Sequence, residues 1–337
     1  MRYVHLDILR AFAILSIVFF HTTGMLYANH FPDSKETYSS LYFVFNQCYL
    51  VNFAMVVFTA LSGYLFMLLY NMGKYHSKKT FILKKIKRLL LPFVVFTILI
   101  VFTQDFTNKT IAECTMLCLK SFLRGSFGHL WYLPGLFWCF VLAIILAHSF
   151  KGNKMVQLSI FVISIATALL FNDIEQNLLG LLHGIRWFFF FYMGMLLAEY
   201  HNLLQKKLSL HILLLILTIA LCIIHPFPPY ADRDIILMLT LSISLFPLFF
   251  LTENFFGDTL LSGVKAISKY SYGIYIFHCW IAPFLVSTTA QRLFHLAPIC
   301  QQYTFAFPMM LFCATFTLSF MATYLLQKSK IGKYLLG

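Results

Sequence analysis

The sequence predicts an all-α, polytopic integral membrane protein that crosses the bilayer about ten times. Of the 337 residues, 60% are hydrophobic and 11% are charged, whereas about 25% are charged in an average soluble domain. The charged residues are also clustered, so long uncharged stretches lie between them. Stretches of about 18 or more apolar residues form membrane helices, because a helix satisfies its own backbone hydrogen bonds in lipid.

The uncharged stretches define the ten expected helices. They cover residues 8–28, 42–70, 89–104, 130–148, 155–171, 185–200, 208–225, 234–252, 271–289 and 304–326. The longest polar connections between them are 71–88 and 105–129. No remaining stretch is long enough for a soluble domain. We therefore expect residues 1–337 to form a single transmembrane domain with no fused soluble domain.

The distribution of basic residues predicts the orientation, because cytoplasmic loops are enriched in Lys and Arg. With a cytoplasmic N-terminus, 17 of the 25 basic residues lie on the cytoplasmic side and six on the other, while Arg10 and Arg186 fall within helices. Both termini are then cytoplasmic, in agreement with an even number of helices. The formal net charge of +13 reflects this asymmetry and gives no reason to expect a nucleic-acid partner.

The first expected helix contains two residues that can carry a charge, Arg10 and His21. They are 11 residues apart, which places both on one helix face at a separation of about 16.5 Å along the axis. Ionisable groups in membrane helices usually face a cavity or a partner. The pair suits a long anionic ligand that enters from the cytoplasm with its reactive end at His21. Alternatively, Arg10 pairs with Asp7 or lipid phosphates and His21 only stabilises the bundle.

Four other positions in the expected helices are candidates for function, and most of them also have a structural interpretation. His278 lies well inside the ninth helix, and Arg186 at the outer end of the sixth suits either an anionic substrate or a lipid headgroup. Trp131, in "HLWYL", suits a substrate contact or an interfacial aromatic belt. Ser62, in "LSGYLF", suits close helix packing.

The eight cysteines have no spacing typical of a zinc site. Most lie in apolar runs, where a cysteine behaves as a small hydrophobic residue. We therefore expect no metal and assign the cysteines no chemistry.

In their order and spacing, these motifs resemble the acyltransferase-3 family of bacterial membrane-bound O-acyltransferases. The similarity covers nearly the whole chain. It includes the arginine that precedes a histidine by 11 positions, Phe58 with "LSGYLF", "KKIKRLLLP" with Arg88, "HLWYL", "FFFFYMGMLLA", and "YGIYIFH" ending at His278. Two departures are Thr59, where the family often has a second phenylalanine, and a basic run that is richer in lysine than usual.

The resemblance implies transfer of an acyl group, usually acetyl from acetyl-CoA, to a sugar hydroxyl of an envelope glycan or its lipid-linked precursor. It implies a multi-pass protein of the bacterial inner membrane. The partners would be acyl-CoA, an envelope glycan or polyprenyl-linked saccharide, and the lipid bilayer. No permanently bound cofactor and no metal are expected, because a thioester is already activated. Succinyl-CoA is an alternative donor.

The resemblance also assigns roles to residues. His21 would deprotonate the acceptor hydroxyl or briefly take the acyl group, since imidazole titrates near neutrality. Arginine suits phosphate better than lysine does, and the CoA phosphates would be held by Arg10, Arg88, Lys84 and Lys85. The candidates for contacts with the substrate or the oxyanion are Ser62, Tyr64, Trp131, His278 and Arg186.

Two other classes of function stay open. A transporter or flippase for a lipid-linked sugar also tolerates charges in the membrane, but it would favour broken helices and internal symmetry, which the sequence does not display. A non-catalytic assembly or sensor protein would be unaffected by His21→Ala.

Overall fold

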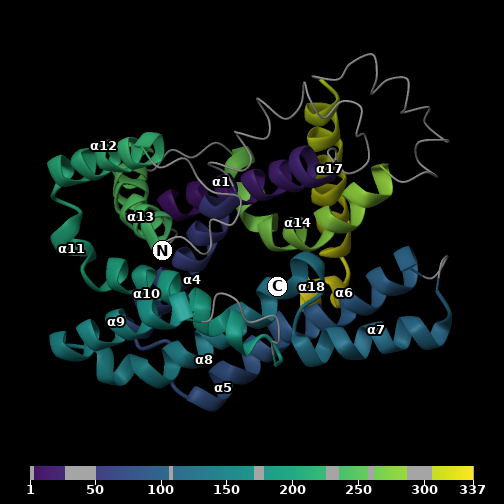
Figure 1. The fold of residues 1–337 in the computed structure, drawn as a ribbon, viewed down its shortest axis with the longest axis horizontal. Helices are drawn as coiled ribbons and strands as arrows, with labels where there is room; N and C mark the ends of the chain where they lie inside the picture. Colours follow the sequence, from purple (N-terminus) through teal and green to yellow (C-terminus); the bar gives the residue numbers. More distant parts are fainter. Residues whose placement is uncertain are drawn as a thin grey trace. The chain divides into compact units, whose positions relative to one another are not determined.

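The computed structural model describes residues 4–26, 51–105, 109–170, 178–224, 235–256, 262–286 and 306–336 (Figure 1). All regular secondary structure in these residues is helical, which confirms the predicted class. The chain forms two compact units, and neither is a continuous segment. The first unit contains Met1–Phe58 and Lys207–Lys333, and the second contains Thr59–Lys206 and Tyr334–Gly337.

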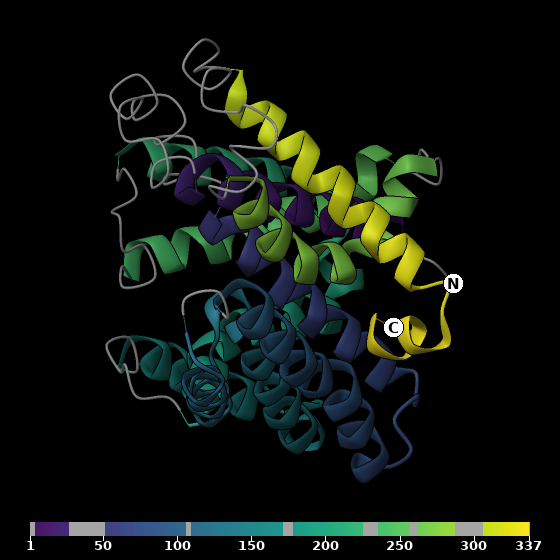
Figure 2. The same cartoon turned by 90° about the vertical axis from the view of Figure 1, so that its right-hand side faces the viewer.

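The first unit is built around a pair of helices that are far apart in the sequence. Helix α1 packs against α14, and α14 also packs against α17, the long yellow helix in Figure 2. The helices of this unit are α1 (Val4–Phe20), which continues into the π-helix η1 (His21–Leu26), α12 (Leu208–Ile224), α13 (Ile235–Phe256), α14 (Ser262–Val286) and α17 (Phe307–Leu326).

In the second unit, α10 packs against both α8 and α9. Its elements are α5 (Lys78–Lys85), η5 (Ile86–Leu90), α6 (Leu91–Ile100), η6 (Val101–Asp105), α7 (Ile111–Arg124), η7 (Gly128–Trp131), α8 (Tyr132–Phe150), α9 (Lys154–Leu170), α10 (Leu181–Glu199) and α11 (His201–Leu204). Two helices contain residues of both units. They are α4 (Val51–Asn71) and α18 (Lys330–Leu336), and each begins in the first unit and ends in the second.

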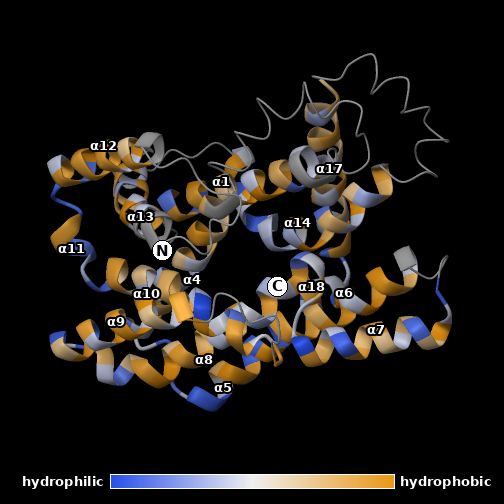
Figure 3. Cartoon of the chain, in the orientation of Figure 1, coloured by the Kyte–Doolittle hydropathy of each residue, from blue (hydrophilic) through white to orange (hydrophobic). Residues whose placement is uncertain are grey.

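Each of the ten expected stretches contains a helix, although residues 42–50 of the second stretch and one to three end residues of six others lie outside the described residues. Six helical segments in the described part of the chain are long and apolar enough to cross a membrane, and three shorter apolar helices accompany them. Figure 3 shows that most helices are predominantly hydrophobic, whereas α5 and α7 contain clear hydrophilic segments. The chain is therefore a multi-pass membrane protein, and the count of ten stays a prediction.

Two expected connections contain helices that the hydropathy pattern missed. Within 71–88, α5 begins at Lys78 because the Ser77 side chain accepts a hydrogen bond from the Thr80 N–H at 3.4 Å. Within 105–129, α7 begins with a reciprocal capping box between Thr110 and Glu113 and ends at Gly125, whose φ is 63°. These caps form hydrogen bonds with backbone groups that have no partner within the helix. Short helices can therefore form in these polar stretches, which the hydropathy pattern assigned to connections.

The small residues of "LSGYLF" allow close packing, as predicted. A Cβ added at Gly63 of α4 would lie 1.9 Å from the Phe191 carbonyl oxygen of α10. The reverse contact is equally tight, because a Cβ at Gly194 would lie 1.9 Å from the Ala60 carbonyl oxygen. The backbones of α4 and α10 therefore approach each other at two glycines, in the manner of small-residue contacts between membrane helices.

Candidate functional site

His21 lies where α1 changes from an α-helix to the π-helix η1. The Nδ1 atom of His21 is 3.0 Å from the carbonyl oxygen of Ile17. A carbonyl only accepts hydrogen bonds, so we assign the proton of the neutral ring to Nδ1. The Nε2 atom then carries the lone pair and is the basic nitrogen of His21.

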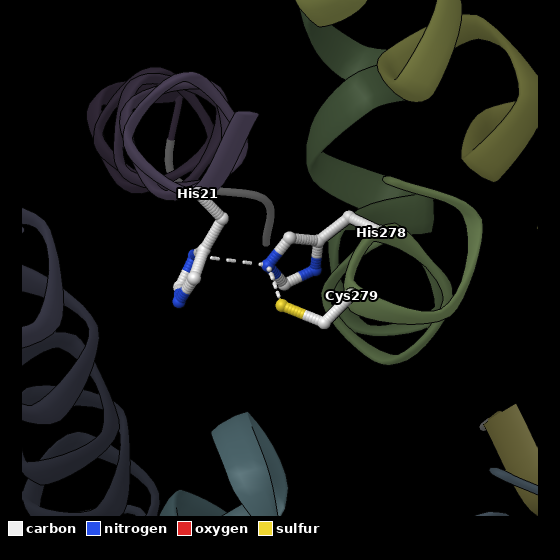
Figure 4. A group of neighbouring side chains, drawn as sticks. All are labelled: His21, His278 and Cys279. Atoms are coloured by element: carbon white, nitrogen blue, oxygen red, sulfur yellow. Dashed lines mark hydrogen bonds between the residues drawn. The ribbon is translucent and has the colours of Figure 1, made fainter. Parts of the chain in front are cut away.

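His278 is fully buried on α14, and its ring faces His21. Its Nδ1 atom is 2.7 Å from the Tyr275 carbonyl oxygen and 3.2 Å from that of Ile274. By the same reasoning Nδ1 carries the proton and Nε2 the lone pair. This Nε2 lies 3.2 Å from Nδ1 of His21, which therefore donates to it (Figure 4).

Cys279 completes a group that we call the histidine cluster, formed by His21, His278 and Cys279. The Cys279 Sγ atom lies 3.0 Å from Nε2 of His278. Figure 4 shows the sulfur and His21 meeting the same nitrogen, while the other nitrogen of His21 points away from His278. His278 thus accepts hydrogen bonds from both neighbours through a single atom.

One ligand atom from each of these three residues lies within 4.8 Å of the others, a spacing that one metal ion could occupy. However, the His21 nitrogen nearest to the group is Nδ1, which faces the Ile17 carbonyl. A protonated nitrogen has no lone pair for a metal. We therefore interpret the cluster as a chain of hydrogen bonds, and the expectation of no metal stays a prediction.

Arg10 lies near the start of α1 in a second group, the arginine cluster, with Asp7 and Ser268. Its Nη1 atom donates to the Ser268 hydroxyl at 3.2 Å and lies 3.5 Å from the Asp7 carboxylate. The Ser268 hydroxyl in turn donates to Asp7 at 2.5 Å. The structure thus contains the pairing of Arg10 with Asp7 that the sequence allowed as an alternative, and Ser268 of α14 joins this pair.

The two clusters lie on the same pair of helices. Arg10 contacts Ser268 and His21 contacts His278, so both residues of α1 face α14. This confirms the prediction that Arg10 and His21 share one face. Because the residue numbers rise together on both helices, α1 and α14 run in the same direction.

The other three predicted phosphate-binding residues belong to the second unit. Lys84 and Arg88 are exposed, and Arg88 lies in the π-helix η5. Lys85 is different, because its Nζ atom lies 3.4 Å from the ring centre of Phe140 and 5.3 Å from that of Phe81. This cation–π contact gives Lys85 a structural role within the unit.

The remaining predicted substrate residues also belong to the second unit. Tyr64 is buried, and its hydroxyl bonds with Nδ1 of His201 at 2.9 Å. Ser62 is half-buried on the same helix. Trp131 packs against His183 and Trp187 of α10, with ring centres 4.9 and 5.7 Å away.

Arg186 is half-buried next to Trp187 on α10. The structure therefore brings Trp131 close to the helix turn that contains Arg186.

Sequence reasoning missed Cys279 and Ser268. The adjacency of Cys279 to His278 was visible, but neighbouring residues on a helix do not normally face each other. Ser268 lies ten residues before His278, about the separation of Arg10 and His21. The similar spacing of the two residue pairs would have indicated Ser268 as a partner of Arg10 once α1 and α14 were expected to pack together.

The comparisons with known proteins agree with these observations. The model of a family described as "Acyltransferase domain" matches residues 3–326, almost the entire chain. The chain has no significant match to a curated protein or to a solved structure. With its several apolar helices, the chain is therefore a membrane acyltransferase and belongs to the acyltransferase-3 family.

Proposed function

We propose that the protein transfers an acetyl group from acetyl-CoA to a sugar hydroxyl of a bacterial envelope glycan or its polyprenyl-linked precursor. The observation that supports this best is the protonation pattern of His21. Its Nδ1 atom is held by the Ile17 carbonyl and by His278, so Nε2 is oriented as a base. Within an acyltransferase family, such a base activates the hydroxyl that receives the acyl group.

In this mechanism His21 Nε2 takes the proton of the acceptor hydroxyl as its oxygen attacks the thioester carbonyl. The imidazole becomes an imidazolium, whose Nδ1–H still donates to Ile17 and His278. Both acceptors stabilise the positive ring and fix its orientation. The arrangement corresponds to a base oriented by a further hydrogen-bonding group, as in other acyl-transfer enzymes.

The arginine cluster is the proposed anchor for the donor. Asp7 and Ser268 fix the guanidinium of Arg10, which then presents a preorganised fork to a CoA phosphate. Lys84 and Arg88 are exposed in the second unit and stay proposed phosphate-binding residues, because the family resemblance implies that role. Lys85 contributes less, because its ammonium group already lies over Phe140.

The topology remains part of the proposal: about ten helices, a single transmembrane domain, both termini in the cytoplasm, and residence in the inner membrane. Two observations support it. The basic residues are distributed 17 to six, and α1 and α14 run in the same direction, as expected for the first and ninth of ten helices. In a cysteine-free background, cysteines at Lys79 and Lys151 should resist an impermeant thiol reagent in intact cells, whereas one at Leu178 should react.

Mass spectrometry of envelope glycans tests the function directly. Glycans from a deletion strain should lack one acyl group, and the wild-type gene should restore it. The gene with His21→Gln should not restore it although the protein reaches the membrane. The mass of the missing group distinguishes acetyl from succinyl. Unchanged glycans in the deletion strain, together with no acetyl-CoA binding by the purified protein, would refute the proposal.

A further inference from the structure

We propose that Cys279 takes the acyl group from the donor and holds it as a thioester before His21 directs its transfer to the acceptor. The inference rests on the acyl-CoA donor of the proposed function and adds a covalent intermediate to it. It assigns a role to the sulfur atom of the histidine cluster, which a direct transfer from CoA to the sugar leaves unused.

The hydrogen bonds around His278 support this role. The carbonyls of Ile274 and Tyr275 hold the proton on Nδ1, so Nε2 carries the lone pair, and it lies 3.0 Å from the Cys279 sulfur and 3.2 Å from Nδ1 of His21. When the thiol proton moves to Nε2, the imidazolium donates to the carbonyls on one side and to the thiolate on the other, and the Nδ1–H of His21 keeps the Ile17 carbonyl as its acceptor. A nucleophile within hydrogen-bond reach of a base that a third group orients is the general signature of covalent catalysis.

The other described cysteines lack this arrangement. The Cys139 thiol donates a hydrogen bond to the Gly184 carbonyl at 3.3 Å. A carbonyl is too weak a base to remove the thiol proton. Cys114 and Cys118 lie in an apolar cluster with Val101, and Cys313 is exposed on α17. Among the five cysteines whose side chains the structure describes, Cys279 is therefore the one whose sulfur contacts a histidine nitrogen.

The first half-reaction moves the acyl group from one sulfur to another. The Cys279 thiol gives its proton to His278 Nε2, and the thiolate attacks the carbonyl carbon of acyl-CoA. A carbon–sulfur bond forms to Cys279 as the bond to CoA breaks. The CoA thiolate takes the proton from His278 and leaves as the thiol. One thioester replaces another, so the acyl group keeps its activation.

The second half-reaction uses His21. Its Nε2 takes the proton of the sugar hydroxyl while the oxygen attacks the acyl carbon on Cys279. As the carbon–sulfur bond breaks, the Nδ1 proton of His21 passes to Nε2 of His278 and from there to the Cys279 thiolate. Exchange of the Nε2 proton of His21 with water then restores its starting tautomer. The ester product and the free enzyme result, with no oxidant, reductant or metal consumed. CoA can leave before the glycan arrives, so the two large substrates need not occupy the site together.

An isotope-exchange experiment tests the intermediate without any acceptor. The purified full-length protein in lipid nanodiscs receives acetyl-CoA and isotopically heavy CoA, and mass spectrometry follows the appearance of heavy acetyl-CoA. The wild type should exchange the label, because the first half-reaction is reversible. Cys279→Ala should slow exchange at least about 100-fold, a loss comparable to removal of a positioned proton-transfer group. Cys313→Ala, the matched control on α17, should exchange like the wild type.

A second measurement does not depend on a variant that folds. After incubation with acetyl-CoA, peptide mapping of the wild type should find the acetyl group on Cys279, and neutral hydroxylamine should release it as it releases thioesters. Cys279→Ser, which nearly preserves the size of the side chain, should also lose exchange because a hydroxyl is a weaker nucleophile. His21→Gln should fail to acylate glycans in cells but should still carry the label on Cys279, which excludes His21 as the acylated residue.

The outcomes separate this inference from the proposed function. If the wild type acylates glycans but neither exchanges label nor carries acetyl on Cys279, direct transfer is correct and the intermediate is refuted. The same holds if Cys279→Ala exchanges like the wild type. If the wild type leaves glycans unmodified and does not bind acetyl-CoA, the proposed function itself fails.

Discussion

Helices α1 and α14 meet through two polar clusters that differ in charge and in what their protons can do. In the arginine cluster, Asp7 and Ser268 surround a permanently charged guanidinium, which has no lone pair to accept a proton. In the histidine cluster, two neutral imidazoles and a thiol share one lone pair at Nε2 of His278. The first arrangement holds a charge in place, whereas the second can move a proton. The difference predicts that changes in the first affect stability and donor affinity, and changes in the second affect chemistry.

The largest expected effect comes from His21→Gln. Glutamine keeps a hydrogen-bond donor but cannot accept the proton, so acyl transfer should fall by about 10²–10⁴-fold. Acetyl-CoA binding and membrane insertion should stay close to wild type. His148→Gln is the control, because His148 is exposed near the end of α8 and has no proposed chemistry. Normal transfer by His21→Gln would contradict the proposal that the histidine cluster, unlike the arginine cluster, moves a proton in the reaction.

The next effect is on stability and comes from Asp7→Asn. The Asp7 side chain is only 9% exposed and that of Arg10 is 28% exposed, so loss of the carboxylate charge leaves a poorly solvated guanidinium. We expect a cost of about 2 kcal/mol, below the range for a fully buried pair. Thermal unfolding in detergent should report it, and adding Arg10→Gln to Asp7→Asn should recover part of the loss. A double variant that is less stable than Asp7→Asn would contradict the pairing.

A smaller effect is expected for Arg10→Lys. The charge remains but the bidentate geometry for a phosphate is lost, so the KM for acetyl-CoA should rise up to about tenfold, or 1.4 kcal/mol. The kcat should change little. Donor titrations with acetyl-CoA and with acetyl-pantetheine, which lacks the nucleotide phosphates, check the cause. Equal losses for both donors would show that Arg10 does not bind the nucleotide end.

The smallest effect should come from Ser268→Ala. This change removes one hydrogen bond to Asp7 and one from Arg10, and such bonds contribute about 1 kcal/mol to stability. The direct contact between Arg10 and Asp7 persists, so the guanidinium keeps a partner and transfer should change less than it does in Arg10→Lys. Loss of transfer at normal stability would give Ser268 a role in the reaction and would contradict the proposed difference between the arginine cluster and the histidine cluster.

Sequence periodicity predicted the shared face of Arg10 and His21, because an α-helix has a fixed rotation per residue. The small residues of "LSGYLF" predicted the close approach at Gly63. Neither pattern could identify the partners of these residues, since the pairing of α1 with α14 joins segments more than 250 residues apart. Cys279 escaped notice for a local reason: its contact with His278 depends on side-chain rotamers, about which a pattern of apolar residues says nothing.

The parallel course of α1 and α14 fixes a length as well as a contact. The arginine cluster and the histidine cluster are separated by 11 residues on α1, about 16.5 Å along the helix axis. A donor anchored at Arg10 reaches the histidine cluster only if its thioester lies at that distance from its phosphate. The helix pair would then act as a ruler that selects thioesters by the span of their carrier arm. Inserting one α-helical turn between Arg10 and His21 would lengthen that ruler by about 5.4 Å and leave the thioester short of its target.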